Sequence, residues 1–390
     1  MSAWTDWVQA ELREIREADR WRATVAFDGD GVAGRVGDRE VISFASNDYL
    51  GLASHPQVRK ASIEAIERWG SGSGASRLVT GTRTLHHELE GALARWQRTE
   101  RAMLFSTGYA ANLGVLQVFG SGDATIFSDA LNHASIIDGC RLAKARSVVF
   151  RHNDLDHLRG LLRGAPGRRI VVTEAVFSMD GDASPLRELA ALCAQHDALL
   201  IVDEAHAVLE TERLSQLGHA QVLCVGTLSK TLGALGGWVA GDAALIDLLV
   251  NRARTFIFTT APAPAQAAAA LAALQIYCSA EGAALRKRLR GHIDRLRPGH
   301  PSAVVPYIIG SNADAIAAAR RLYERGLYVP AIRPPTVPQG TARLRVALSA
   351  AHTDAMIDRL CEALAPFDSP AVAPAARVAY ARGQGEPVAR

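Results

Sequence analysis

The chain has 390 residues and a formal net charge of only +3. It contains no basic run interleaved with aromatic side chains, which argues against binding to nucleic acid or to an anionic membrane. A chain of this length can bury a large core and form two or three domains. The five cysteines are scattered, odd in number and without C-x-x-C spacing. This pattern predicts a reducing compartment and no metal site.

The N-terminus lacks a basic segment followed by an apolar one, so we predict no signal peptide. The most apolar window, 261–276, is rich in alanine and is interrupted by Pro262, Pro264 and Gln266. Such a window is a poor candidate for a membrane span. We therefore expect a soluble, cytoplasmic protein.

The spacing of apolar residues predicts an amphipathic helix at 4–22, followed by a polar, glycine-containing stretch at 28–37. From about residue 46 to 280, short apolar runs alternate with segments of helical spacing. This alternation predicts an α/β fold with a doubly wound, mostly parallel sheet. The expected strands are 102–106, 124–128, 147–150, 169–175, 198–203, 221–227 and 236–240, and the expected helices include 84–98, 132–145 and 185–197.

The pattern changes after residue 280, where expected helices at 281–296 and 312–326 are mixed with extended stretches at 303–309 and 342–349. This mixture predicts a smaller α+β domain. The predicted organisation is an N-terminal helix and arm (1–45), a large domain (46–280), the small C-terminal domain (281–365) and a Pro-, Ala- and Gly-rich tail (366–390), which we expect to be disordered.

Three residues point to a cofactor. The apolar run 198–202 ends at Asp203, His206 follows it, and Lys230 lies between hydroxyl residues and glycines after the next strand. Ligands of open α/β sheets bind beyond the carboxyl ends of the strands. A lysine, an acid and an imidazole there suit pyridoxal phosphate (PLP), which the lysine binds as a Schiff base. Taken singly, Lys230 could be a solvated loop residue, Asp203 a helix N-cap and His206 a structural histidine.

Two further segments could bind phosphate. Ser71–Arg77 is a glycine–serine loop whose backbone N–H groups could approach a ligand, although many such loops are turns. Ser106–Asn112 follows one strand and opens a helix, so Gly108 and Tyr109 are candidates to bind an anion at the helix N-terminus. A plain strand–helix turn explains that segment equally well.

Three other positions suit roles around a cofactor or substrate. His133 follows the strand 124–128 and could stack on an aromatic ring, although an isolated histidine is more often structural. Ser178, beyond another strand, could donate a hydrogen bond. Arg333, stiffened by the prolines after it, could bind a carboxylate or could be a solvated loop residue.

Several motifs in order resemble the α-oxoamine synthase family of fold-type I PLP enzymes. The resemblance extends from about residue 40 to 355. Its motifs are Ser46–Leu52, Gly72–Gly81, Leu85–Glu90, Asn132–Ser135, Phe177–Asp182, Asp203–His206, Thr227–Lys230, Arg333–Pro338 and Arg343–Arg345. The resemblance implies a mostly parallel central sheet with helices on both faces, and PLP as the cofactor.

The resemblance also implies residue roles. Lys230 would hold PLP and move the substrate α-proton, and Asp203 would pair with the pyridinium nitrogen. His133 would stack on the ring and contribute to catalysis. The other implied cofactor contacts come from Gly108, Tyr109, Ser178, His206 and Thr227. The implied substrate contacts come from Arg22, Asn47, His133, Arg333 and Thr336.

The reaction implied is the decarboxylative condensation of L-alanine with a pimeloyl thioester, carried on coenzyme A or acyl carrier protein, in biotin biosynthesis. A homodimer with interfacial active sites is implied too. One segment departs from the family pattern, because the loop 207–214 after His206 is apolar and charged where a glycine-rich loop is usual. A relative using glycine and a shorter acyl thioester, and a non-catalytic PLP-binding protein, therefore stay open.

Overall fold

The computed structural model describes residues 2–209 and 221–367. They form two compact units. Unit 2 comprises Asn47–Gly291 and His300–Ala303, and unit 1 comprises the described residues within Met1–Ser46, His292–Gly299 and Val304–Arg390. All five cysteines lie among the described residues, and none forms a disulfide.

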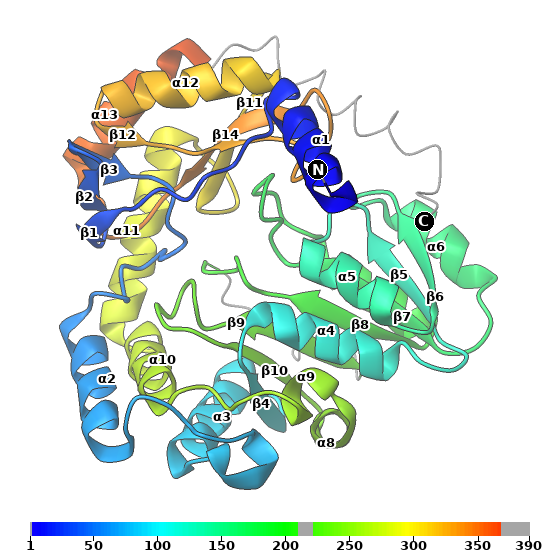
Figure 1. Cartoon of the computed structure of the whole chain (residues 1–390). Coiled ribbons are helices and arrows are strands. Elements are labelled where there is room, and N and C mark those ends of the chain that lie inside the picture. Colours follow the sequence, from blue (N-terminus) through cyan, green and yellow to red (C-terminus); the bar gives the residue numbers. More distant parts are fainter. Residues whose placement is uncertain (1, 210–220, 368–390) are drawn as a thin grey trace. The chain divides into compact units, whose positions relative to one another are not determined.

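A seven-stranded sheet is the centre of unit 2 (Figure 1). Its order is β4-β10-β9-β8-β7-β5-β6, and β10 runs opposite to the other six strands. The strands are β4 (Arg101–Phe105), β5 (Thr125–Asp129), β6 (Arg146–Phe150), β7 (Arg169–Glu174), β8 (Ala198–Asp203), β9 (Val222–Thr227) and β10 (Gly237–Gly241). The seven strands expected from the sequence are confirmed, with ends that differ by at most one residue.

Both faces of this sheet are covered. Leu223 and Val225 of β9 belong to a buried apolar cluster that includes residues of α4, α5 and α8. Cys224, between them, is equally buried on the opposite face. On β10, Trp238 packs edge-on against Trp96, a residue of α3. Burial on both faces explains why these strands read as continuous apolar runs rather than as alternating ones.

The helices of unit 2 follow the expected alternation with the strands. They are α2 (Pro56–Trp69), α3 (Thr84–Gln97), α4 (Gly108–Phe119), α5 (Ala134–Leu142), α6 (Leu155–Arg163), α7 (Leu186–Gln195), α8 (Ala243–Arg252), α9 (Arg254–Ile257) and α10 (Pro264–Tyr277), with a π-helical turn at Arg77–Gly81 and with α11 (Ala280–Leu296) continuing into unit 1. Side-chain caps begin several of them. Thr107 accepts a hydrogen bond from the N–H of Ala110 in α4, and Asp154 accepts one from His157 in α6.

Unit 1 contains two small sheets and three further helices. The sheets have the orders β1-β2-β3-β12 and β11-β14-β13. The elements are α1 (Ala3–Glu17), β1 (Asp28–Asp30), β2 (Ala33–Val36), β3 (Arg39–Ser43), β11 (Val304–Gly310), α12 (Asn312–Glu324), β12 (Leu327–Tyr328), β13 (Ala331–Ile332), β14 (Ala342–Ala347), α13 (Asp354–Leu364) and a 3₁₀ turn at Ala365–Phe367.

The N-terminal segment differs from the sequence expectation in two ways. The helix predicted for 4–22 ends at Glu17, and none of its residues is buried. The stretch 28–37, expected only to be polar and glycine-containing, forms β1 and β2. The β2–β3 hairpin turns at Gly37, whose φ of +57° suits glycine in a two-residue turn. The strands β1 and β2 are short and mostly exposed, so they lack the apolar run that reveals a buried strand.

Two predictions concern residues beyond the described ranges. The tail expected to be disordered begins in the 3₁₀ turn, and its residues 368–390 lie outside the described part of the chain. Residues 210–214 of the atypical loop also lie outside it. Among the described residues, no single helix is long and apolar enough to cross a membrane; one bent pair, α10 with α11, meets that test on length and composition alone.

Candidate active site

Polar side chains end four neighbouring strands of unit 2. Asp129 ends β5, Glu174 ends β7, Asp203 ends β8 and Thr227 ends β9. These strands are mutually parallel and adjacent in the sheet, so their carboxyl ends share one edge. In open α/β sheets this edge is where ligands bind.

Lys230 belongs to a hydrogen-bonded chain of four residues. Its Nζ lies 2.8 Å from Nε2 of His206, and Nδ1 of His206 lies 2.5 Å from the hydroxyl of Tyr49. That hydroxyl donates to Oδ1 of Asn47 at 3.1 Å. The proton directions are consistent if Lys230 donates to Nε2 and Nδ1–H donates to Tyr49. The buried Tyr49 thus sets the tautomer of His206, which in turn holds the lysine amine.

Asp203 is held by a second chain. One oxygen accepts the backbone N–H of Ala205 at 2.9 Å, and the other accepts Nδ2 of Asn112 at 2.7 Å. Asn112 also donates to the hydroxyl of Ser135, which lies 2.8 Å from Nδ1 of His133. The chain therefore links the buried carboxylate to the histidine predicted to stack on the cofactor.

The charged groups around His133 shift its pKa in opposite directions. Its pKa is lowered, first because its surroundings partly desolvate it and then because the charge of Lys230 disfavours the imidazolium, while Asp203 raises it. The net direction favours the neutral imidazole. A neutral, partly exposed ring is suited to stack on an aromatic cofactor and to exchange a proton near neutral pH.

An anion-binding group lies at the start of α4. The N–H groups of Gly108 and Tyr109 are in the first turn of this helix, where no intrahelical acceptor exists. A Cβ added to Gly108 would come within 3.2 Å of Cβ of Thr227, so the helix start directly adjoins β9. The hydroxyls of Thr227 and Ser229 are 2.7 Å apart. Backbone N–H groups and hydroxyls of this kind suit a phosphate.

Ser178 is buried in the turn that follows β7.

Four residues that the structure joins to the site were not predicted from the sequence. They are Tyr49, Asn112, Ser135 and Glu174. Signals existed for two of them: Asn112 lies one turn after Gly108 on the same face of α4, and Glu174 ends an apolar run as Asp203 does.

Arg22, Arg333 and Thr336, predicted to contact substrate, belong to unit 1 and form a group of their own. The guanidinium of Arg22 donates to the hydroxyl of Thr336 at 3.3 Å. The guanidinium of Arg333 donates to the backbone carbonyls of Asp19 and Trp21. In this structure Arg333 therefore anchors the segment that follows α1.

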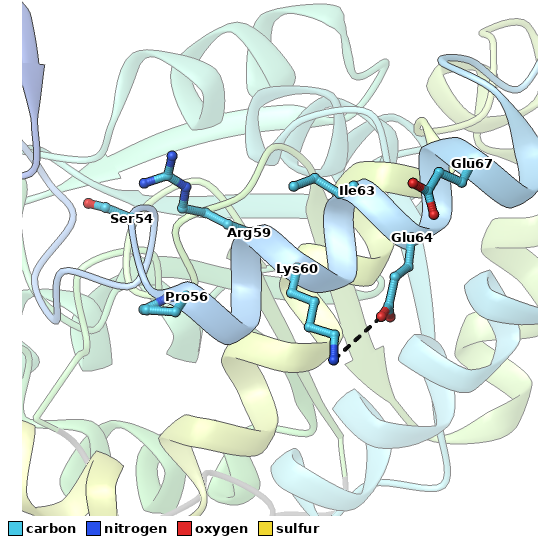
Figure 2. A pocket seen from close by; sticks show the side chains of 7 residues that line it. All are labelled: Ser54, Pro56, Arg59, Lys60, Ile63, Glu64 and Glu67. Atoms are coloured by element: carbon cyan, nitrogen blue, oxygen red, sulfur yellow. Dashed lines mark ion pairs between the residues drawn. The ribbon is translucent and has the colours of Figure 1, made fainter.

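Two surface hollows of unit 2 are built from other residues. Figure 2 shows the first, of about 440 Å³, lined by Ser54 and six residues of α2 with an ion pair between Lys60 and Glu64 at 3.7 Å. The second, of about 340 Å³, contains Arg77 and Glu90, which form two hydrogen bonds of 2.9 and 3.1 Å. In both, the charged groups named satisfy one another, and neither is lined by residues of the Lys230 or Asp203 chains.

The described residues of unit 2 fit PLP. A lysine amine, a buried carboxylate and an anion-binding helix start are the three groups that an amine-linked, ring-protonated phosphate ester requires. In addition, Oε1 of Glu174 is buried and has no hydrogen-bond partner among the described residues. An orphaned buried oxygen beside Asp203 is what a site completed by a bound molecule would leave.

Comparisons with known proteins agree with this arrangement. Residues 39–364 match the family model for aminotransferase class I and II. The 8-amino-7-oxononanoate synthase of Anaeromyxobacter dehalogenans is 49% identical over 383 residues, which cover 92% of this chain and 95% of that protein. Serine palmitoyltransferase from S. paucimobilis with a bound PLP–myriocin aldimine superposes with a TM-score of 0.86 at 30% identity, covering 96% of this chain and 98% of that one. The 8-amino-7-oxononanoate synthase of Francisella tularensis gives a TM-score of 0.71 at 27% identity, covering 84% and 96%.

Proposed function

The chain belongs to the aminotransferase class I and II family and, within it, to the 8-amino-7-oxononanoate synthases, and on that premise we propose that it condenses L-alanine with a pimeloyl thioester. It is an acyltransferase whose cofactor is PLP. In the proposed reaction the α-carbon of alanine bonds to the thioester carbonyl carbon. The carbon–sulfur bond and the bond to the alanine carboxylate break, releasing the thiol and carbon dioxide and leaving 8-amino-7-oxononanoate, an early intermediate of biotin biosynthesis.

The observation that carries the proposal is the pair of hydrogen-bonded chains around Lys230 and Asp203. PLP, when bound, supplies the electron sink for the bonds that break at the α-carbon. Lys230 is the residue we assign to bind the cofactor and to move the α-proton. Its amine is held 2.8 Å from Nε2 of His206, and Tyr49 fixes that histidine in turn. A base held in this way needs little reorganisation before it takes a proton.

Asp203 is the residue we assign to the pyridinium nitrogen. Its two N–H donors, from Ala205 and Asn112, hold its oxygens in place. The N–H groups of Gly108 and Tyr109, with Thr227, are assigned to the phosphate. Ser178 and His206 are assigned to the ring substituents and His133 to the ring face.

For the substrates, we assign Asn47 and His133 from unit 2, and Arg22, Arg333 and Thr336 from unit 1. An arginine presents a planar fork that suits a carboxylate. Binding of alanine by Arg333 would require its present hydrogen bonds to Asp19 and Trp21 to be exchanged for the substrate carboxylate. The choice between coenzyme A and acyl carrier protein as the thioester carrier is left to assay.

The test is a product assay with the purified holoenzyme. Alanine plus pimeloyl-coenzyme A, or pimeloyl-acyl carrier protein, should give 8-amino-7-oxononanoate, and Lys230→Ala should give none. Activity only with glycine and a shorter acyl thioester would replace the substrate assignment. PLP bound without turnover across the panel would make the chain a non-catalytic binding protein.

We also propose a cytoplasmic homodimer with active sites at the interface. Its support is a group of exposed apolar side chains in unit 2. Val79 is 74% exposed and Phe258 is 70% exposed, on segments joined by a bridge between Ser76 and Thr260. Large exposed apolar groups of this kind mark interaction surfaces. Sedimentation at assay concentration should give a dimer, whereas an active monomer would refute the arrangement.

A further inference from the structure

The site contains a second buried acid next to Asp203. Glu174 and Asp203 are the last residues of β7 and β8, and they are paired across the two parallel strands. Paired residues of neighbouring strands direct their side chains to the same face of the sheet. Glu174 is 2% exposed and Asp203 is 7% exposed. Two carboxyl groups therefore share one water-poor position beside Lys230.

The two acids have unequal hydrogen-bond partners. Each oxygen of Asp203 accepts an N–H, one from Ala205 and one from Asn112. Glu174 accepts the backbone N–H of His133, and its Oε1 is buried without a hydrogen-bond partner among the described residues. The protein thus solvates a negative charge on Asp203 and leaves one on Glu174 half-solvated.

Electrostatics assign the proton to Glu174. Burial, and then the charge of Asp203, raise its pKa well above the ordinary range, and Asp129 of β5 raises it further. Lys230 and the N–H of His133 act in the opposite direction without reversing the shift. Neighbouring buried carboxyls cannot both ionise, so one keeps its proton. Here Glu174, whose pKa is raised, is the carboxyl that keeps the proton.

We propose that Glu174 is a neutral carboxylic acid of the active site, which positions His133 through its backbone N–H and donates its O–H to an acceptor oxygen of the bound molecule. The orphaned oxygen is the observation that points to this acceptor, because buried polar groups nearly always have a partner. The acceptor is an oxygen on either the cofactor or the amino acid substrate. The inference rests on the proposed function for the identity of these molecules, but the protonation of Glu174 does not.

Infrared spectroscopy of the cofactor-free protein tests the protonation directly. At pH 7.5 the wild-type protein should show a carboxylic acid C=O band, and labelling its glutamates with ¹³C at the side-chain carboxyl should shift that band. Glu174→Gln should remove it. Absence of a glutamate-dependent band in the wild-type protein would overturn the inference without reliance on any variant folding.

Titration of the cofactor-free protein with PLP tests the donor role. Glutamine is isosteric with the neutral acid, because its oxygen can accept the His133 N–H and its NH₂ can donate. Glu174→Gln should therefore bind PLP within about 3-fold of wild type. If the acceptor belongs to the cofactor, Glu174→Ala should bind PLP about 10-fold more weakly, the loss of about one buried hydrogen bond. The matched control is Asp203→Asn, the same neutralisation one strand away, which should weaken binding far more. Equal losses in Glu174→Gln and Asp203→Asn would refute a neutral Glu174.

The two possible acceptors give different results in Glu174→Ala. Weaker PLP binding with an unchanged KM for alanine assigns the acceptor to the cofactor. Unchanged PLP binding with a raised KM assigns it to the substrate. No change in either would refute the donor role. The infrared and PLP titrations use no acyl donor, so failure of the product assay would overturn the proposed reaction and leave the protonation of Glu174 intact.

Discussion

Two mostly buried histidines, one in each unit, differ in charge, because His152 is a cation and His352 is neutral near pH 7. In unit 2, His152 lies between two carboxylates, with Nδ1 2.9 Å from Asp129 and Nε2 2.8 Å from Asp182. In unit 1, His352 stacks on Phe44 with ring centroids 4.3 Å apart, and its hydrogen bonds are with the backbone groups of Ser349 and Ser43. Burial lowers the pKa of His152, but the two carboxylates outweigh it and raise the pKa to about 10. Burial lowers the pKa of His352 to about 4.

The difference shows that the partners, and not burial alone, decide the charge of a histidine. His352 donates Nε2–H to the carbonyl of Ser43 and accepts the N–H of Ser349. Burial outweighs the hydrogen bonds to Ser43 and Ser349, which raise the pKa of His352, and nearby His292 lowers that pKa further. His152 faces anions at both nitrogens and so must donate twice. As a cation it joins the turn before His133 to the loop that carries Ser178.

Replacing Asp129 should test the charge of His152 with the largest loss in the free energy of unfolding. The side chain of Asp129 is 0% exposed and also accepts the N–H groups of Leu131 and Asn153. An amide nitrogen cannot accept, so Asp129→Asn leaves a buried donor facing a donor and leaves the His152 cation with only the partly exposed Asp182. We expect a loss of about 3–5 kcal/mol in the free energy of unfolding. Urea denaturation at pH 7 measures it, and a loss below about 1 kcal/mol would contradict a buried ion pair.

A fall in pH should lower the stability of the fold through His352. Its folded pKa lies below the unfolded value, so its contribution to stability is present above about pH 6.5 and is lost as the pH falls through about 4. The shift corresponds to about 3 kcal/mol. Urea denaturation from pH 7 to 4 should show this loss, and His352→Gln, which keeps a donor and an acceptor, should lack that part of it. Parallel pH curves for the two proteins would disprove the assignment.

A rise in pH should lower the stability of the fold through His152. Its folded pKa is raised, so its contribution is present below about pH 6.5 and is lost as the pH rises through about 10. Because Asp182 is partly solvated, we expect about 2 kcal/mol rather than the full shift. The measurement is the difference in unfolding free energy between wild type and His152→Gln from pH 6.5 to 10. That difference should shrink with rising pH, and a constant difference would show an uncharged His152.

Asp182→Asn should have the smallest effect of the four. The side chain of Asp182 is 43% exposed, so water replaces much of what the substitution removes. We expect about 1 kcal/mol or less at pH 7, again by urea denaturation. A loss as large as that of Asp129→Asn would mean that the two carboxylates are equally buried in solution. The difference in charge between His152 and His352 would then depend on the number of carboxylates around the ring and not on how deeply each one is buried.

The sequence predicted much of the fold and part of the site. The strands of unit 2 could be predicted because each is an apolar run buried on both faces. The position of Asp203, His206 and Lys230 just beyond the strands could be predicted because each follows the end of such a run, whereas their roles toward a cofactor stay predictions. The strands β1 and β2 could not be predicted, since short exposed strands carry no such pattern. Arg333 was predicted to bind a carboxylate, and no residue near it in the sequence indicates the backbone carbonyls that it contacts.

The sequence by itself determined the order of the elements, the family and the cofactor, because strand patterns and local motifs are properties of neighbouring residues. Only the tertiary structure revealed how the chemistry is supported. Tyr49 meets His206 across 157 positions of the chain, and Asn112 meets Asp203 across 91. The charges of Glu174, His152 and His352 depend on such long-range partners. A side chain's ionisation is set by the groups packed around it, and these groups come together only when the chain folds.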